Sequence, residues 1–315
     1  MDSSGSDGRP RSDYAPSSID HLTDAQLVQA IVQGRKTYRG RRIAFGDHNI
    51  CRVDETTVAK YSGCPEDYIT QPSEALTLDL VFRCTTIPVP RVRRVVNETE
   101  GRSTLTWIVM DYIPGRQLSV VWPTMSVEER LCVVFTLRDY VRQLRGIRHP
   151  RAAVPGPVSS GNDALRCTSP VFGKVIEQRG PFASYAELSA WFDHAQRVVT
   201  RNLNAKKHPQ PVSFDAMMGT SSLVLCHQDL NMRNIIVGDD GRLWLVDWAW
   251  AGFYPPWFEY IAMKEQSENE ETVTGRNEPF WDLMIPFICG TFYREEEWMN
   301  RSVNDALDYR FESTP

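Results

Sequence analysis

The sequence predicts an α+β fold in which a small, β-rich lobe precedes a larger, mostly helical lobe. Up to residue 113, strand-like runs alternate with turns and surround one apolar-faced helix. After Pro114-Gly115, helix-capping patterns recur and the apolar residues repeat at helical spacing. The chain has 315 residues, of which 42% are hydrophobic, so it is long enough to build both lobes.

Composition excludes several classes of function. The formal net charge of −5 argues against nucleic acid as a partner, and no apolar run is long enough to predict a membrane span. The N-terminal residues include no apolar stretch typical of a secretion signal. Seven cysteines without a CxxC pair predict neither a disulfide framework nor a zinc site. We therefore expect a cytoplasmic protein that is a monomer or a weak dimer.

The first lobe is predicted to span residues 19–113, after a disordered tail at 1–18 that is rich in Ser, Asp, Gly and Pro. Thr23 and Gln26 form a capping-box pattern, which predicts a helix that ends at Gly34. The basic run that follows fits either a solvated connector or a phosphate-binding segment.

Strand and helix patterns fill the rest of this lobe. The runs 49–53 and 56–61 flank Asp54-Glu55 and predict a β-hairpin. Apolar residues at helical spacing predict a helix over 71–84. The apolar run 104–113 follows a turn and predicts the last strand of the lobe.

The second lobe is predicted to span 114–315 and to be mostly helical. Capping-box patterns formed by Ser126 with Glu129 and by Ser184 with Glu187 predict the starts of two of its helices. Residues 149–170 and 204–222 are expected to be loops. One short hairpin is expected within residues 223–248, where Gly238-Asp-Asp-Gly241 separates two apolar runs.

This hairpin region contains the most informative motif of the chain. His227-x-Asp229-x-x-x-x-Asn234 follows an apolar strand, and Asp247 ends the returning strand 18 residues after Asp229. Phosphoryl transfer requires one carboxylate to accept the proton of the attacking hydroxyl, and a second carboxylate with an amide oxygen to hold Mg²⁺ against the phosphates. Asp229 suits the first role, Asn234 and Asp247 suit the second, and His227 is expected to brace the catalytic loop. Each residue taken alone is more often structural.

A phosphotransferase also requires a cation for the nucleotide phosphates. Val58-Ala59-Lys60 lies on a predicted strand, as the corresponding lysine does in protein kinases. Glu74 follows 14 residues later, in the first turn of the next predicted helix, so we expect an ion pair between Lys60 and Glu74. The alternative for this short pattern alone is a lysine on the surface.

These motifs together resemble the aminoglycoside phosphotransferase and choline kinase branch of the protein-kinase-like superfamily, and in particular the fungal aminoglycoside-phosphotransferase-like proteins. The resemblance covers roughly residues 45–260, in the expected order. It implies a two-lobed kinase-like fold, ATP bound in a cleft, and a hinge at 110–113 in which backbone groups near Met110, Asp111 and Tyr112 contact the adenine. The resembling segments are VAKY, SEALTLDLV, TTIPVPRV, IVMDYIPG, LRDYVRQLR, CHQDLNMRNIIV and LWLVDWAWAGFYPPWFEY.

Departures from the protein-kinase pattern favour a small-molecule substrate. No G-x-G-x-x-G loop is present, and only Gly46 lies near its place. Gln228 replaces the arginine of the kinase H-R-D motif, and Asn231 replaces the lysine that follows the catalytic aspartate of Ser/Thr kinases. Asp247-Trp248-Ala249 replaces Asp-Phe-Gly, and no Ala-Pro-Glu segment follows.

The acceptor is less legible. The family places it against parts of 155–220 and 250–300, where aromatic and acidic side chains would suit an amine through cation–π contacts and ion pairs. The alternative is that the aromatic residues are core and that the glutamates form a solvated face. The candidates are Trp250, Tyr254, Trp257, Glu259 and Trp281, and the glutamates at 265, 268, 270 and 271.

The sequence therefore predicts an ATP- and Mg²⁺-dependent O-phosphotransferase that acts on a hydroxyl of a small metabolite. Two other functions stay open. One is a non-catalytic kinase-like protein that binds a nucleotide or a partner, which the complete set of catalytic positions argues against. The other is a protein kinase, which Gln228 and Asn231 argue against.

Overall fold

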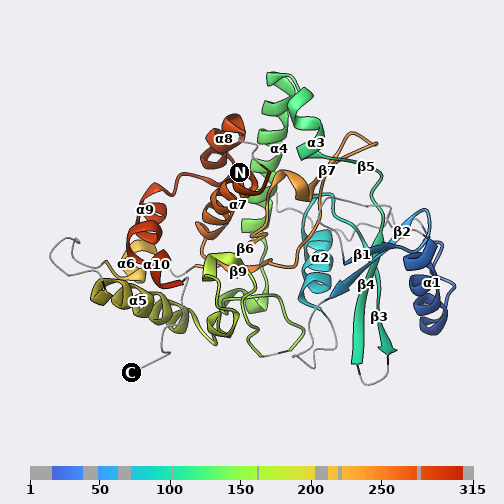
Figure 1. The fold of residues 1–315 in the computed structure, drawn as a ribbon, viewed down its shortest axis with the longest axis horizontal. Coiled ribbons are helices and arrows are strands. Elements are labelled where there is room, and N and C mark those ends of the chain that lie inside the picture. The colour runs from blue at the N-terminus through green and yellow to red at the C-terminus, as the bar shows by residue number, and fades with distance from the viewer. Residues whose placement is uncertain are drawn as a thin grey trace, which may run out of the picture. The chain divides into compact units, whose positions relative to one another are not determined.

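The computed structural model describes residues 16–37, 49–62, 72–100, 103–161, 163–202, 212–218, 222–274 and 278–307. The chain divides into an N-terminal unit, Met1–Pro123 with Met232–Val246, and a C-terminal unit, Thr124–Asn231 with Asp247–Pro315. The first is rich in strands and the second is mostly helical, which confirms the predicted fold class (Figure 1). The boundary predicted after residue 113 stays a prediction. Residues 1–15 of the predicted tail, and Gly46, lie outside the described residues.

A four-stranded antiparallel sheet forms the centre of the N-terminal unit. Its strand order is β1-β2-β4-β3, and Lys60 lies opposite Ile50 on one side and Ile108 on the other. The predicted hairpin is present as β1 and β2, with Asp54 Oδ1 accepting the N–H of Thr56 in the turn (2.8 Å). The elements are β1 (Ile50–Arg52), β2 (Thr57–Ser62), β3 (Val92–Glu100), β4 (Ser103–Asp111), α1 (Asp24–Thr37) and α2 (Ser73–Cys84).

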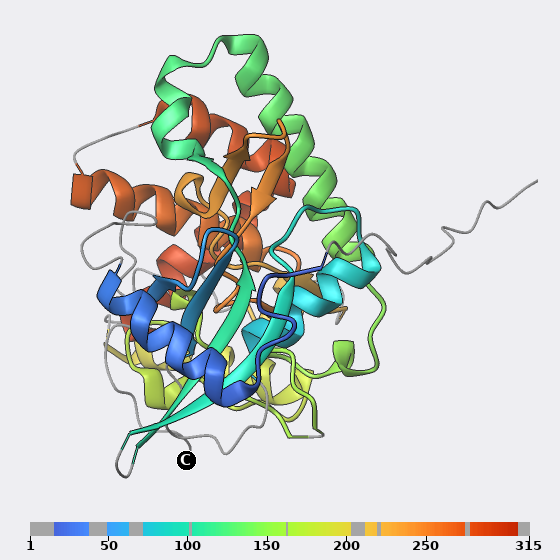
Figure 2. The same ribbon diagram turned by 90° about the vertical axis from the view of Figure 1, so that its right-hand side faces the viewer.

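Two helices cover the opposite faces of this sheet, as Figures 1 and 2 show. On the face of α1, a cluster of buried side chains forms the core: Ile19, Leu27, Ile31, Ala59, Val96, Trp107 and Val109. Successive strand residues point to opposite faces, so Lys60, which follows Ala59, points to the face of α2. The alternation in β2 therefore decides which helix can supply a partner for Lys60.

Helix α1 begins as predicted but does not end at Gly34. The Gln26 N–H donates to Thr23 Oγ1 (3.3 Å) and the Thr23 N–H to Gln26 Oε1 (2.9 Å), which is the expected capping box. The helix continues to Thr37, so the predicted end is wrong. Gly34 lies against β1: a Cβ at this position would be 2.1 Å from the carbonyl oxygen of Arg52. The glycine thus allows close packing of the helix on the strand.

A second, three-stranded antiparallel sheet in the N-terminal unit contains the predicted hairpin of residues 223–248. Strands β7 (Ile235–Gly238) and β8 (Leu243–Leu245) pair as expected. The third strand, β5 (Gly115–Gln117), was not predicted, since it has only three residues and begins with a glycine. Gly115, with a φ of 153°, lies opposite Gly238, where a Cβ would be 2.4 Å from the carbonyl oxygen of Val237. The short helix α3 (Leu118–Val121) follows β5.

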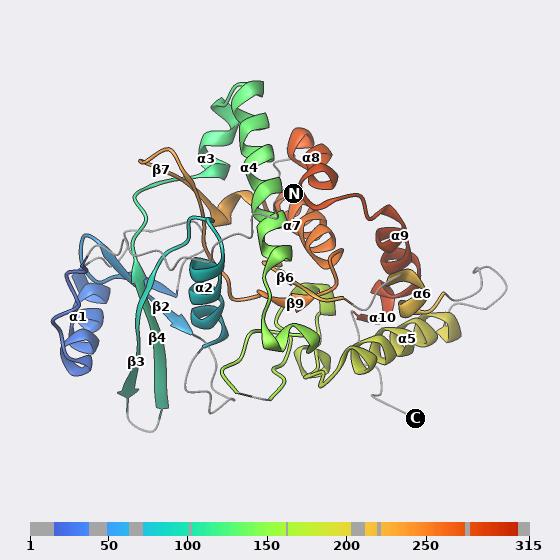
Figure 3. The same ribbon diagram turned by 180° about the vertical axis from the view of Figure 1, so that it is seen from behind.

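Helices build the C-terminal unit (Figure 3). The capping box predicted at Ser126 is complete, with the Glu129 N–H on Ser126 Oγ (3.2 Å) and the Ser126 N–H on Glu129 Oε2 (2.7 Å). Strand β6 pairs with β9, a strand that the sequence did not predict. No helix among the described residues is long and apolar enough to cross a membrane. The elements are α4 (Val127–Gly146), α5 (Tyr185–Asn202), α6 (Phe214–Met218), β6 (Val224–Cys226), β9 (Gly252–Tyr254), α7 (Phe258–Thr274), α8 (Pro279–Cys289), α9 (Tyr293–Ser302) and α10 (Asn304–Leu307).

Replacing Gly34 with alanine should destabilise the protein by about 1–3 kcal/mol, because the added methyl group overlaps a backbone carbonyl that a side-chain rotation cannot move away. Urea-induced unfolding measures this change. Gly146→Ala is the matched control: Gly146 ends α4, and a Cβ there meets no atom within 4 Å. Equal stability of the two variants would contradict the packing assigned to Gly34.

Candidate active site

The loop after β6 holds His227 and Asp229 in a short hydrogen-bonded arrangement within the C-terminal unit. The Asp229 N–H donates to Nδ1 of His227 at 3.2 Å. The side-chain amide of Asn231 donates to Asp229 Oδ1 at 2.7 Å, and the Asn231 N–H donates to the Asp229 carbonyl at 3.0 Å. Asp229 keeps 9% of its surface exposed, whereas His227 is fully buried. The geometry therefore orients one carboxylate and leaves the histidine inside the protein, where its ring lies 4.3 Å from that of Trp248.

A buried carboxylate supports this loop from the interior. Glu259 lies in the first turn of α7 and is 1% exposed. Its two oxygens accept the backbone N–H groups of His227 (2.5 Å) and Gln228 (3.1 Å). A loop that leaves the end of a strand has N–H groups without ladder partners, and buried N–H groups need acceptors. Glu259 supplies two acceptors at once and so determines the path of the chain immediately before Asp229.

The protonation of Glu259 is set by opposing effects. Burial raises the pKa of Glu259 to about 7, while the two N–H donors and the charge of Arg145 act in the opposite direction. Arg145 extends from α4 and donates to the carbonyl oxygens of Pro256 (3.0 Å) and Cys289 (2.6 Å). It therefore ties α4 to the segment before α7 and to the end of α8.

Two residues of the motif have left-handed backbone conformations that side chains other than glycine rarely adopt. Gln228 has a φ of 68° and Asp247 a φ of 62°. Each such residue costs about 1–3 kcal/mol, and such strain concentrates at functional sites. The strain falls on Gln228, directly before the predicted base Asp229, and on Asp247, the predicted metal ligand at the end of the hairpin.

The ion pair predicted in the N-terminal unit is present. Lys60 Nζ donates to Glu74 Oε1 at 2.7 Å, and both side chains are about nine-tenths buried. Glu74 lies in the first turn of α2, on the face of the sheet to which Lys60 points. Removing charges from water is unfavourable unless they are paired, so the ion pair offsets part of the cost of burying both groups. The pair places the lysine ammonium on the face of the sheet that α2 covers.

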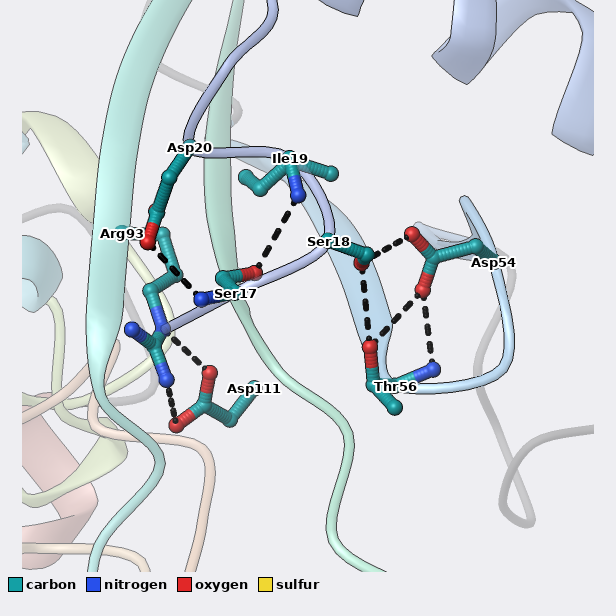
Figure 4. A network of polar contacts seen from close by, with 8 residues as sticks. All are labelled: Ser17, Ser18, Ile19, Asp20, Asp54, Thr56, Arg93 and Asp111. Carbon is teal, nitrogen blue, oxygen red and sulfur yellow. Dashed lines mark hydrogen bonds and ion pairs between the residues drawn. The ribbon is translucent and has the colours of Figure 1, made fainter. Parts of the chain in front are cut away.

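In the predicted hinge at the end of β4, two backbone N–H groups are already hydrogen-bonded within the protein. The Asp111 N–H donates to the Arg91 carbonyl (3.0 Å) and the Tyr112 N–H to the Thr56 carbonyl (2.8 Å), so both amides are already used inside the protein. Arg93 holds the Asp111 carboxylate through two bonds, of 2.5 and 3.1 Å (Figure 4). Among the described residues, none accepts a hydrogen bond from the N–H of Ile113, which follows directly.

The segment 17–20 supports the same hinge from outside the sheet (Figure 4). Ser18 Oγ donates to Asp54 Oδ2 (2.6 Å) and lies 3.1 Å from Thr56 Oγ1, while Ile19 is buried in the core under α1. These hydrogen bonds lower the pKa of Asp54 against its burial. Ser18, which the sequence assigned to the tail, thus begins a turn that is attached to the β1–β2 turn, where the Thr56 carbonyl lies.

The two predicted metal ligands flank the β7–β8 hairpin along the chain: Asn234 precedes it and Asp247 follows it. Asn234 ends a short 3-10 helix (Met232–Asn234), and its carbonyl accepts the N–H of Val246 at 3.0 Å. This bond closes the hairpin in the N-terminal unit. Asp247 is the next residue along the chain and begins the second segment of the C-terminal unit. An amide and a carboxylate oxygen are ligands of the kind that Mg²⁺ prefers.

The predicted aromatic and acidic wall is largely core. Tyr254, Trp257, Trp281 and Glu259 have at most 2% of their surface exposed. Trp257 packs on Phe258 with ring centroids 4.4 Å apart, within a cluster of aromatic rings. Of the five candidates only Trp250 is partly exposed. The alternative of a core therefore holds for three of the four aromatic residues, Tyr254, Trp257 and Trp281, and Glu259 serves the loop rather than a substrate.

Sequence reasoning missed the role of Glu259. The available signal was an acid in the first turn of a helix, directly after an aromatic, proline-rich segment, where the helix dipole favours a negative charge. The pattern did not show that this turn lies under the loop before Asp229. That contact joins residues 32 positions apart and depends on how α7 packs.

One protein-family model and several solved structures are similar to this chain. A family model described as the phosphotransferase enzyme family matches residues 74–272, more than half of the chain. A comparison with curated protein sequences finds no match. One similar solved structure is the gentamicin complex of APH(2")-IIa, with 15% sequence identity and a TM-score of 0.46 over 80% of this chain and 74% of that chain. A second is the spectinomycin phosphotransferase APH(9)-Ia with ADP and spectinomycin, with 13% identity and a TM-score of 0.41 over 80% of this chain and 77% of that chain. A third is the apo form of a thermostable mutant of the aminoglycoside phosphotransferase APH(4)-Ia, with 16% identity and a TM-score of 0.39 over 80% of this chain and 86% of that chain.

Replacing Glu259 with glutamine should destabilise the protein by about 1–3 kcal/mol at neutral pH, because the amide NH₂ turns a donor toward one of the two backbone N–H groups. The raised pKa gives a second signature. Wild-type Glu259 takes up a proton on folding between its unfolded pKa of 4.5 and its folded pKa of about 7, so its contribution to stability falls as the pH rises through this window. Urea unfolding across the window measures both effects.

The variant cannot titrate at this position, so the difference in unfolding free energy between the two proteins should depend on pH between these values. Glu268→Gln, at an exposed position of the same helix, is the control and should change neither quantity. A pH-independent difference between wild type and Glu259→Gln would contradict the raised pKa.

Proposed function

The chain belongs to the phosphotransferase enzyme family, and from that premise we propose that it transfers the γ-phosphoryl group of ATP to a hydroxyl of a small molecule, in a reaction that requires Mg²⁺. The observation that carries the proposal is the geometry of the loop at Asp229. The Asp229 carboxylate is buried except for 9% of the residue's surface, is oriented by Asn231 at 2.7 Å, and follows two backbone amides that Glu259 holds.

In this proposal Asp229 is the general base. It accepts the proton of the acceptor hydroxyl while the hydroxyl oxygen forms a bond to the γ-phosphorus, and the bond from that phosphorus to the bridging oxygen breaks to release ADP. Asn231 keeps one carboxylate oxygen in place through its side-chain amide. His227 is a positioning residue, because its Nδ1 accepts the Asp229 N–H while its ring is buried.

The N-terminal unit is proposed to bind the nucleotide. The buried ammonium of Lys60, held by Glu74, would contact the phosphates. At the hinge, the N–H groups of Asp111 and Tyr112 already have acceptors, so the proposed donor to the adenine is the N–H of Ile113. Met110, at the end of β4 and 6% exposed, would pack beside the base.

Asn234 and Asp247 are the proposed metal ligands. Their amide and carboxylate oxygens fit the preference of Mg²⁺, which takes one or two protein carboxylates and completes its shell with phosphate oxygens and water. When bound, the ion would neutralise negative charge on the transferred phosphate. Asp247 brings the formal charge and is held in a strained backbone conformation, while Asn234 brings a neutral oxygen.

The acceptor is proposed to be a small molecule rather than a protein. Asn231 stands at the position of the lysine of Ser/Thr protein kinases, and its side-chain amide donates a hydrogen bond to Asp229. The experiment that tests the function is a screen of metabolite extract and a panel of hydroxylated amines, gentamicin and spectinomycin included, for products heavier by one phosphoryl group after incubation with ATP and Mg²⁺. Label appearing on extract proteins alone would favour a protein kinase, and nucleotide binding without any transfer would favour a non-catalytic protein.

Asp229→Asn should lower the rate of transfer by about 10²–10⁴, because the isosteric amide cannot accept the proton. Its carbonyl oxygen still accepts the bond from Asn231, so stability and nucleotide affinity should stay close to wild type. Rate assays and calorimetric nucleotide titration measure the two effects. Asp239→Asn, in the exposed β7–β8 turn, is the control. Full activity of Asp229→Asn would reject the assignment of the base.

Asp247→Asn should abolish transfer and remove most of the dependence of nucleotide affinity on Mg²⁺, because the proposed site loses its formal charge. Asn234→Ala should slow transfer with a smaller change in nucleotide affinity, since it removes only a neutral ligand. Calorimetric titration of nucleotide with and without Mg²⁺ separates the two variants. Wild-type affinity that does not change with Mg²⁺ would contradict both assignments.

A further inference from the structure

An exposed apolar surface lies on the C-terminal unit, where α4 and α8 run side by side (Figures 1 and 3). Four side chains form it, and we call them the α4–α8 patch: Leu131 (36% exposed), Phe135 (57%), Leu283 (68%) and Phe287 (37%). The rings of Phe135 and Phe287 meet edge to face at 5.2 Å, so the two helices contribute to one continuous surface. Contiguous apolar surface of this kind marks an interaction site more often than a scatter of single residues does.

The outer face of α4 carries a pattern that reaches beyond these apolar residues. Glu128, Leu131, Phe135 and Arg138 are all exposed and recur at intervals of three, four and three residues. This is the spacing of the a and d positions through which helices pair. The apolar pair lies in the middle of the stripe, with a negative charge on its N-terminal side and a positive charge on its C-terminal side.

Such a stripe is complementary to itself under two-fold symmetry. If two copies of α4 pack antiparallel with the axis level with residue 133, each Leu131 faces the partner's Phe135. In the same register, each Glu128 faces the partner's Arg138, so the two charges of the stripe meet their opposites at both ends of the contact. The Glu128 and Arg138 charges therefore favour this antiparallel register.

Arg138 is already held at the edge of the patch. Its guanidinium lies 4.5 Å from the centroid of the Phe287 ring and donates to the Phe287 carbonyl at 3.2 Å. This arrangement keeps the stem of the side chain along the apolar surface and its charge at the rim. Less side-chain freedom is lost when such a residue forms an intermolecular pair.

From the self-complementary charge pattern around the apolar centre, we propose that the α4–α8 patch binds a second copy of this chain, forming a two-fold symmetric homodimer through antiparallel α4 helices. Leu283 and Phe287 widen the buried surface on both sides of the helix pair, as an interface that excludes water requires. The interface includes none of the residues assigned to phosphoryl transfer, so the dimer can be tested independently of activity.

Sedimentation velocity over a wide range of protein concentration tests the proposal. Wild type should approach twice the mass of one chain as the concentration rises. Phe135→Glu should raise the dissociation constant of the dimer by about a hundredfold, because symmetry places two buried charges against the partner's Leu131. Ile176→Glu is the matched control, since Ile176 has the same 57% exposure in the same unit but lies outside the patch.

The register is tested by exchanging charges. Glu128→Arg and Arg138→Glu alone each set like charges against one another across the interface and should weaken the dimer about tenfold or more. The double variant restores opposite pairs and should recover most of the wild-type affinity. Both positions are exposed, so folding should not be at risk.

A wild-type protein that stays monomeric at all concentrations would overturn the proposal and leave the patch to a different partner. A dimer that Phe135→Glu does not weaken would place the interface elsewhere on the protein. A dimer that Phe135→Glu weakens, but whose affinity the double charge exchange fails to restore, would reject the antiparallel register.

Discussion

The loop that carries Asp229 depends on a buried carboxylate that accepts two backbone amides. Glu259 satisfies the N–H groups of His227 and Gln228, which leave the end of β6 without a strand to pair with. The two acceptor oxygens belong to the first turn of α7. The loop is therefore anchored to a helix that packs in the hydrophobic core. The strained φ of Gln228 persists only where the surroundings hold it, and two charge-assisted hydrogen bonds on that peptide segment supply such a constraint.

The same principle operates in the N-terminal unit, where a charge is positioned by a partner on another element. Successive side chains of β2 point to opposite faces of the sheet, so Ala59 packs in the core under α1 and Lys60 lies on the other face. There Lys60 pairs with Glu74, in the first turn of α2. Arg93 does the equivalent for Asp111 at the end of β4. In both places the ion pair joins a strand to a neighbouring element, so the groups proposed to contact a nucleotide are set by the sheet and not by flexible loops.

Much of the candidate site could be predicted because its spacing is local. Lys60 and Glu74 lie on consecutive elements, so a lysine on a predicted strand and an acid in the first turn of the next predicted helix were enough to relate them. The role of Glu259 could not be predicted, and the burial of Trp257 and Trp281 stayed one of two alternatives, since an aromatic residue or an acid in this segment has the same local pattern whether it lines a pocket or fills the core.

By itself the sequence determined the hairpin of β1 and β2, the helix α2, the ion pair on β2, and the segment that carries Asp229, because propensity, alternation and capping act over a few neighbouring residues. Only the tertiary structure showed that α1 continues past Gly34, which packs against the Arg52 carbonyl. It also showed that the N–H groups of Asp111 and Tyr112 already donate to acceptors within the protein. Those outcomes depend on the close approach of segments distant along the chain. Packing creates such contacts, and a local pattern does not encode them.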